Sequence, residues 1–342
     1  MLFPKSISSI FRGLRLLACA AVATGGLAHA AALTVLLADD HAPHAEFVRH
    51  LRELQAGSGR FDVVRLDGPA APTGTEVAAT EEERANAGVR TRSIRQSSSS
   101  AAAETVTVAV GPSAARAALE RPGNEPLLLA MLSRLEYENL RASPALRRPE
   151  RRIGVLLRDP AMADQLALIA AALPQKRRLG VVVTPESEPL LRELQRVASP
   201  SAGWELQIES APDAKSLAGA LRNVLPRSDA LIVLPDLIGD NQAATLAVLR
   251  AGASAGLPVF GASDGMVRSG GLAAAVSTPA QLAQQARAFG QKLANGGGGG
   301  GGSPLIEAAT PASVRVNGTV ARALGLRLPD ERELTERVAA AR

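Results

Sequence analysis

The chain has 342 residues, 46% of them hydrophobic, and is long enough to bury the cores of two domains of ordinary size. Its formal net charge of +5 falls to +2 without the first thirty residues, which hold three basic and no acidic side chains. Because the basic residues form no block or stripe, and only one Trp and one Tyr are present, the composition argues against nucleic-acid binding.

The first thirty residues have the organisation of a secretion signal. Lys5, Arg12 and Arg15 precede a mostly apolar run from Leu16 to Ala23, and residues 28–30 read Ala-His-Ala, an A-x-A cleavage site. A membrane anchor needs about 18 unbroken apolar residues, and this run is shorter. We therefore expect cleavage after Ala30 and export to the periplasm.

A lipoprotein is the alternative, because residues 16–19 read Leu-Leu-Ala-Cys and fit a lipobox. Only three apolar residues separate Arg15 from Cys19, which leaves almost no hydrophobic region, so we favour a soluble product. Cys19 is the only cysteine, and cleavage would leave a mature chain without disulfides although an oxidising compartment would permit them.

Short apolar runs then alternate with helical patterns in two series. A helix with Phe47, Leu51 and Leu54 on its apolar face follows the first run. The strands expected in the first series are Leu33–Ala38, Phe61–Leu66, Thr105–Val110, Leu127–Leu132 and Ile153–Leu157. The second series has Leu179–Val183, Glu205–Ile208, Ala230–Leu234 and Val259–Gly261. This alternation predicts parallel, doubly wound sheets covered on both faces.

Two segments depart from this pattern. Residues 68–104 are rich in Ala, Thr, Ser, Glu and Arg and show no apolar period, which predicts a disordered surface insertion. Residues 296–302 are all glycine, a flexible linker with no side chains to pack. No strand leads directly into the glycine run and no Gly-Lys-Ser/Thr follows it, so a phosphate-binding role is not indicated.

Asp39, Asp40, His41 and His44 cluster after the first strand, and a His-x-x-His with adjacent carboxylates could supply three ligands to zinc. The spacing alone is a weak signal, and Cys and His elsewhere offer no second cluster. The alternative is that an Asp-His pair at the start of a helix caps the helix N-terminus and faces solvent. We predict no metal site and no cofactor.

Residues 261–265 read Gly-Ala-Ser-Asp-Gly, a literal G-x-S-x-G that follows a strand as in hydrolase nucleophile elbows. A hydrolase triad of this type needs a histidine after the serine in the chain, and the last histidine is His50. We therefore expect a strand-end turn and no enzyme.

The C-terminal segment has the clearest signals for where its strand and helix begin and end. Ser313–Val316 reads as a short strand, Asn317 as a turn, and the stretch from Val320 as an amphipathic helix that Gly325 stops and Pro329 blocks.

With the preceding elements, this tail resembles the substrate-binding proteins of ABC-type importers. The resemblance spans nearly the whole mature chain, from Leu33 to Leu334. The segments that carry it, besides the C-terminal one, are 109–115, 126–132, 165–174, 177–182, 229–236, 257–263, 270–274 and 277–279.

The resemblance implies an α/β fold of the type I periplasmic-binding-protein kind, with two Rossmann-like lobes, parallel sheets and a hinge, and a small ligand clamped between the lobes. We expect a signal peptide at 1–30, lobe 1 at 31–175, lobe 2 at 176–266 and a return to lobe 1 at 267–295. The glycine linker at 296–302 and a strand-helix tail at 303–342 complete the chain.

Ligand contacts are then expected in the turns at strand carboxyl ends, where hydroxyls and backbone N–H groups would hold a carboxylate or carbonyl. Asp236 or Asp264 could hold an amino group. For each residue an ordinary cap or turn role is the alternative. The candidates are Asp39, His41, Gly111, Ser113, Thr184, Asp236, Ser263 and Asp264.

One departure from the family concerns aromatic residues. Members that bind aromatic amino acids offer rings for stacking, whereas neither Trp204 nor Tyr137 follows an expected strand. The resemblance therefore implies a small polar solute, with an inner-membrane ABC permease as partner. The alternative is an envelope accessory protein that has lost solute binding and serves an outer-membrane receptor.

Overall fold

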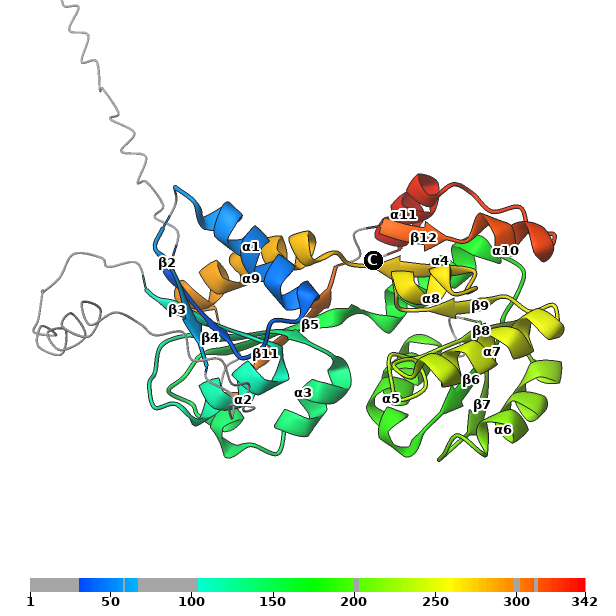
Figure 1. Ribbon diagram of the computed structural model, residues 1–342, viewed down its shortest axis with the longest axis horizontal. Coiled ribbons are helices and arrows are strands. Elements are labelled where there is room, and N and C mark those ends of the chain that lie inside the picture. Colours follow the sequence, from blue (N-terminus) through cyan, green and yellow to red (C-terminus); the bar gives the residue numbers. More distant parts are fainter. Residues whose placement is uncertain are drawn as a thin grey trace, which may run out of the picture.

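The computed structural model describes residues 31–57, 59–66, 104–199, 203–297, 302–310 and 313–341. Within them the chain forms two α/β lobes side by side (Figure 1). The predicted signal peptide with Cys19, nearly all of the predicted insertion at 68–104 and residues 298–301 of the glycine run lie outside the described residues. The parallel sheets predicted from the strand-helix series and the two lobes that the family resemblance implies are confirmed.

Lobe 1 is built on a parallel sheet with the strand order β11-β5-β4-β3-β1-β2. The apolar runs of the sequence form its central strands, because strands covered on both faces must be apolar throughout. The strands are β1 (Leu33–Leu37), β2 (Phe61–Arg65), β3 (Val106–Val110), β4 (Leu127–Leu132), β5 (Ile153–Pro160) and β11 (Leu305–Ala309).

Helices cover both faces of this sheet (Figure 1). Phe47 and Leu51 of α1 (Ala42–Gln55) pack with Phe289 of α9 (Pro279–Ala294) on one face. The other face buries Leu119 and Tyr137. It carries α2 (Gly111–Glu120), α3 (Arg134–Leu140) and the 3₁₀ turn Pro144–Arg147.

Lobe 2 has the strand order β12-β10-β9-β8-β6-β7, with β12 antiparallel to β10 and the other pairs parallel. Its strands are β6 (Arg178–Val183), β7 (Glu205–Ser210), β8 (Ala230–Ile232), β9 (Val259–Gly261), β10 (Ala273–Val276) and β12 (Ser313–Val316).

Helices also cover both faces of the lobe 2 sheet. One core packs α4 (Met162–Ala172), α5 (Glu188–Val197), α10 (Gly318–Ala323) and α11 (Glu331–Ala340). The opposite core packs α6 (Leu217–Val224), α7 (Gln242–Ser254) and the short α8 (Asp264–Arg268). Two 3₁₀ turns complete the lobe, at Pro185–Ser187 and Leu225–Arg227.

Three connections join the lobes in the described part of the chain, from β5 to α4, from β10 to α9 and from β11 to β12. The boundary expected at residue 175 is therefore one helix too late. Ile169 of α4 is buried in lobe 2, and the buried Gln165 amide donates to the Ala275 carbonyl of β10 at 2.9 Å. An almost wholly apolar helix carries no polar face to indicate which lobe it covers.

The return to lobe 1 also differs from the expectation. It was expected from residue 267, but β10 still belongs to the lobe 2 sheet, and α9 is the element that returns. Three of the four residues of β10 are alanine, a residue depleted in strands, so the pattern gave no strand signal. The tail at 303–342 is likewise divided, with β11 in lobe 1 and β12 in lobe 2.

The C-terminal segment has the strand, turn and helix that the sequence predicts. The Asn317 side chain accepts from the backbone N–H groups of Thr319 and Val320, both at 3.1 Å, so α10 begins at Gly318, before Val320. Gly325 has φ +65°, the left-handed conformation typical after a helix end. None of the helices in the described ranges combines the length and the apolar character that crossing a bilayer requires.

Candidate functional site

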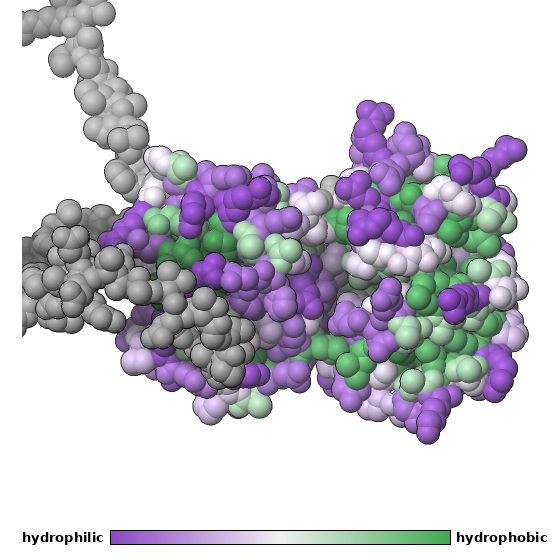
Figure 2. Space-filling model, viewed as in Figure 1, coloured by the Kyte–Doolittle hydropathy of each residue, from purple (hydrophilic) through white to green (hydrophobic). Residues whose placement is uncertain are grey.

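A cavity of about 580 Å³ lies between the lobes. Its walls come from the carboxyl ends of β4 and β5, from the turns after β8, β9 and β10, and from the N-terminal turn of α1. Open parallel sheets bind ligands outside the carboxyl ends of their strands. The molecule narrows between the lobes, and hydrophilic residues line the lobe 1 side of the narrowing (Figure 2).

Two predicted residues, Ser263 and Asp264, line this cavity. The Ser263 hydroxyl caps α8 by accepting from the Met266 backbone N–H at 3.2 Å. The side chain is exposed. The Asp264 carboxylate pairs with Arg268 of the same helix and lies 3.9 Å from Arg315 Nε. The strand-end turn expected at 261–265 is therefore present and presents both side chains to the interlobe space.

Charges of both signs line the cavity. The acidic residues are Asp159, Asp240 and Asp264, and the basic residues are Arg158, Arg268 and Arg315. Burial raises the pKa of Asp159 to about 6. The hydrogen bond that its carboxylate accepts from the Arg134 backbone N–H at 2.9 Å acts in the opposite direction and lowers the pKa. Burial also raises the pKa of Asp240, and the Arg158 guanidinium opposes it. Such a wall can hold a solute that carries both a cationic and an anionic group.

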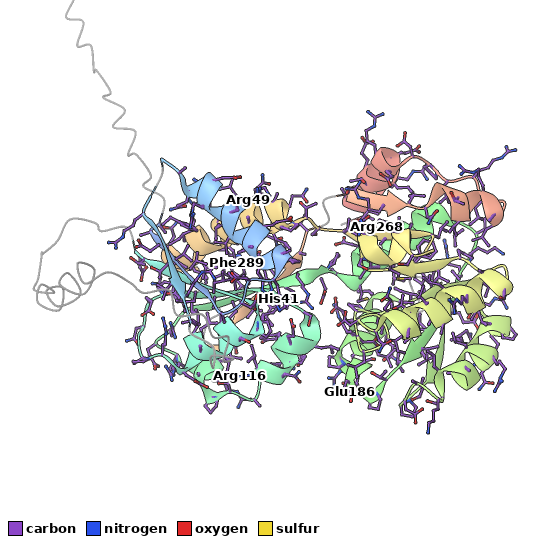
Figure 3. The ribbon with its side chains drawn as sticks, in the orientation of Figure 1. His41, Arg49, Arg116, Glu186, Arg268 and Phe289 are labelled. Atoms are coloured by element: carbon purple, nitrogen blue, oxygen red, sulfur yellow. The ribbon has the colours of Figure 1, made fainter. Side chains whose placement is uncertain are left out.

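Asp39, His41 and Gly111 meet around the buried His44 at the carboxyl ends of β1 and β3. Asp39 Oδ1 lies 2.7 Å from His44 Nδ1 and accepts from the His41 backbone N–H at 3.2 Å. Burial alone would raise the pKa of Asp39, but these hydrogen bonds outweigh it and the pKa is lowered. His41 lies on the part of lobe 1 that faces lobe 2, opposite Arg268 (Figure 3), and Pro43 of the same turn lines the cavity.

Gly111 is required where it stands. Its φ is +82°, and a Cβ on it would lie 2.6 Å from His44 Cε1, so the glycine lets the imidazole pack against the first turn of α2. Ser113, two residues later, lies exposed in that turn and outside the cavity lining.

Substitution of Gly111 by alanine is expected to lower the free energy of unfolding by about 2 kcal/mol, because the change adds a collision with His44 to left-handed strain of about 1 kcal/mol. Gly57→Ala is the matched control, since Gly57 has φ +78° and open space around its Cβ position. Chemical denaturation of both variants measures the difference. Equal losses would show that His44 does not constrain the turn.

Thr184 and Asp236 lie together in lobe 2 but are buried. Asp236 Oδ1 accepts from the backbone N–H groups of Ile238 at 2.9 Å and Gly239 at 3.1 Å, and its Oδ2 accepts from the Ser187 hydroxyl. Thr184 precedes the 3₁₀ turn Pro185–Ser187, and its backbone N–H donates to the Ser187 hydroxyl. Asp236 is 1% exposed, so its carboxylate holds a turn together and does not line the cavity.

Residues that sequence reasoning missed also line the cavity. Arg158 and Asp159 end β5, and the strand-end argument would have included them had that strand been extended past Leu157. Met131, the last residue but one of β4, has φ +62° and is the one non-glycine residue of the described ranges with a positive φ. The register between β4 and β5 shifts there. Such strained backbone clusters at ligand sites, and no sequence signal marks it.

The zinc and hydrolase alternatives gain no support from the arrangement. His41, His44 and His50 all lie on or beside α1 in lobe 1, whereas Ser263 lies in lobe 2. Among the residues that the structure describes, no group of three or more His, Cys, Asp or Glu side chains could hold a metal ion.

Comparison with known sequences identifies one family. A sequence profile described as "ABC transporter substrate binding protein" matches residues 100–333. A search of curated proteins finds no match to the chain.

Solved structures share the fold. A substrate-binding protein with adhesive properties from Clostridium difficile, in its ligand-free, open form, aligns at a TM-score of 0.58 with 15% identity over 88% of this chain and 96% of that one. A conserved domain protein from Vibrio cholerae aligns at 0.52 with 19% identity over 90% and 98%. An ABC domain in complex with L-Trp from Streptococcus pneumoniae aligns at 0.50 with 16% identity over 89% and 98%. At these identities the similarity establishes the fold.

Proposed function

Because this chain belongs to the ABC transporter substrate-binding protein family, we propose that it is the solute-binding component of an ABC-type importer and clamps a small polar solute between its lobes. The observation that carries the proposal is the interlobe cavity of about 580 Å³, to which both lobes contribute, with residues 158–160 at the end of β5 among them. A solute that touches both walls favours the closed arrangement over the open one.

The cavity wall supports a polar solute with charges of both signs. Asp264 and Asp159 would hold a cationic group, and Arg315 with the Ser263 hydroxyl would hold a carboxylate or carbonyl. Aromatic stacking gains no support, since Tyr137 is buried in lobe 1 and Trp204 lies under the Arg177 guanidinium, 5.3 Å from it. We assign ligand contact to Ser263 and Asp264 and a supporting role beneath the lobe 1 wall to Asp39, His41 and Gly111.

We place the mature protein in the periplasm, on the basis of the signal predicted at 1–30, and propose an inner-membrane ABC permease as its partner. A thermal-shift screen of amino acids, short peptides and organic acids tests the proposal, because a ligand that binds only the folded state raises the melting temperature. If no solute raises it and an outer-membrane receptor co-purifies instead, the importer role fails and the envelope accessory role replaces it.

Replacement of Asp264 by alanine is expected to weaken the affinity for the solute found in that screen by about tenfold or more, the cost of losing one charge-assisted hydrogen bond. Stability should change little, because Asp264 is partly exposed and its partner Arg268 is exposed. Calorimetric titration measures the affinity, with Glu336→Ala on α11 as the control. An unchanged Kd in the Asp264 variant would remove this residue from the site.

A further inference from the structure

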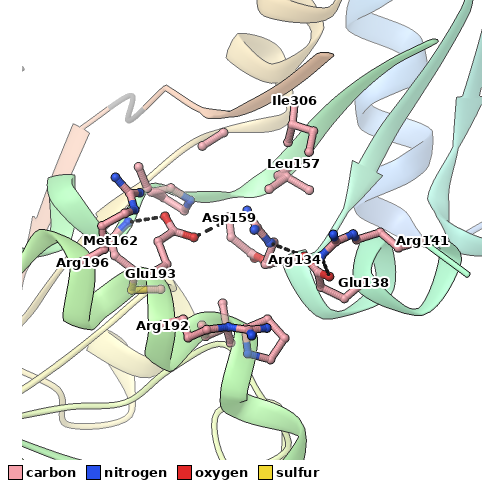
Figure 4. Close-up of a pocket in the computed structure, with 15 residues that line it drawn as sticks. Arg134, Glu138, Arg141, Leu157, Asp159, Met162, Arg192, Glu193, Arg196 and Ile306 are labelled. Carbon is pink, nitrogen blue, oxygen red and sulfur yellow. Dashed lines mark hydrogen bonds and ion pairs between the residues drawn. The ribbon is translucent and has the colours of Figure 1, made fainter. Parts of the chain in front are cut away.

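A second cavity, of about 560 Å³, lies on the other side of the β5–α4 connection, between α3 of lobe 1 and α5 of lobe 2 (Figure 4). It shares only Asp159 and Pro160 with the solute cavity. Apart from Asp159, none of the residues proposed to contact the solute lines it.

Arginines from both lobes surround this cavity. Arg134 opens α3 and Arg141 follows it, seven positions apart. Arg192 and Arg196 are four apart on α5, which puts them on one side of that helix. Figure 4 shows all four around the same space.

Two carboxylates of the wall, Glu138 and Glu193, form ion pairs with the lobe 1 arginines. Glu138 lies 3.0 Å from Arg134 Nε and 2.7 Å from Arg141 Nη1. Glu193 lies 3.7 Å from Arg134 Nη1 and accepts from the Met162 backbone N–H at 3.3 Å.

On the lobe 2 side the two arginines differ in their partners. Arg192 is 2.6 Å from Glu188, which is outside the lining, and Arg196 makes no ion pair with the described part of the chain. Asp159, the third carboxylate of the wall, accepts from the Arg134 backbone N–H at 2.9 Å, on the lobe 1 side. Arg196, with Arg192 one turn before it on α5, is therefore the group of this wall that is left to bind an anion.

The floor of the cavity is apolar. Leu157, Met162 and Leu190 are buried beneath it. Ile306 of β11 also lines it and is 39% exposed, one of three large hydrophobic side chains in the described ranges that are exposed to this degree. An exposed isoleucine beside arginines offers a surface that a hydrocarbon chain can cover.

The geometry points to a binding site for an amphiphilic carboxylate in this cavity, with the carboxylate on Arg192 and Arg196 and the hydrocarbon chain over Met162 and Ile306. The volume lies within the range of about 300 to 1,000 Å³ that small-molecule sites occupy. Both lobes supply walls, so the site spans the hinge without using the solute cavity.

Calorimetric titration of the purified mature protein with octanoate, octanol and octylamine tests this inference. Octanoate should bind at least tenfold more tightly than either of the others, and more weakly as salt is added. Equal binding of octanol would show that only the apolar floor attracts the chain and would overturn the assignment.

Variants locate the binding. Arg192→Ala with Arg196→Ala should weaken octanoate binding tenfold or more, while Arg222→Ala on α6 should leave it unchanged. All three side chains are exposed, so folding should survive the changes. Asp264→Ala should not alter octanoate binding, which separates this site from the solute cavity. A loss in the Arg222 or Asp264 variant, or none in the double variant, would contradict the site.

Discussion

Asp236→Ala is expected to lower the free energy of unfolding by about 3 to 4 kcal/mol, because each buried group left without its partner costs about 1 to 3 kcal/mol. The change removes the acceptor of three donors, the N–H groups of Ile238 and Gly239 and the Ser187 hydroxyl. Residues 234–240 and the 3₁₀ turn before α5 would then lose the contact that joins them. Urea denaturation measures the effect.

Asp236→Asn is the matched control. An amide keeps an acceptor for the two backbone N–H groups, so its loss of stability should be less than half that of the alanine variant. If Asp236 instead served the ligand, alanine would leave stability intact and abolish solute binding. That result would return the residue to the site that the sequence first suggested for it.

Asp159→Asn is expected to change how stability depends on pH. The pKa of Asp159 is raised to about 6 in the folded state, above the ordinary value of about 3.9 for an unfolded chain. Between these values the folded state binds more protons, so the stability of the native protein falls as pH rises. Two units of pKa correspond to about 3 kcal/mol.

The asparagine side chain does not ionise in this pH range, so the variant never carries the buried negative charge. At pH 7.5 it should therefore be more stable than the native protein by up to about 3 kcal/mol, and the difference should vanish as pH falls to about 4. Thermal or urea unfolding across this range measures it. A constant difference at all pH values would mean that hydrogen bonding, and not ionisation, causes the effect.

Asp229→Asn is expected to change the stability at neutral pH in the opposite direction. The hydrogen bond from Arg178 lowers the pKa of Asp229 to about 2, although partial burial opposes it. Its carboxylate therefore stabilises the folded state above pH 4, and this stabilisation is lost as pH falls toward 2. The two asparagine variants should thus shift stability at pH 7.5 in opposite directions.

A charge at Asp159 that costs stability at neutral pH lies between two cavities. Groups that cost stability and are nevertheless kept are characteristic of functional sites. This supports Asp159 as a contact for the cationic part of the solute, in addition to Asp264.

Periodicity predicted the strands well because a parallel strand between two helical layers must be apolar on both faces. It could not allocate α4, which is nearly all apolar, or find β10, whose alanines resemble a helix. The crossing points therefore came out wrong, whereas the nine strands expected in the two series are all present.

The candidate site was predicted in part, for a related reason. The strand-end argument found Ser263 and Asp264, because where a parallel strand ends follows from the sequence. It also selected Asp236, since an aspartate after a strand reads the same whether it faces solvent or closes a turn. Met131 could not be found, because its left-handed backbone arises from the register shift between β4 and β5.

The edge strand β11 has a consequence for the order in which the protein can be completed. This strand, Leu305–Ala309, pairs with β5 of lobe 1 but is synthesised after all strands of lobe 2 except β12. The first lobe therefore cannot complete its sheet until most of the chain has emerged, and its last pairing spans about 150 residues between Gly154 and Leu305. Such distant pairing slows folding. A chain that folds late stays unfolded longer, and that is the state in which a polypeptide threads through a secretion channel.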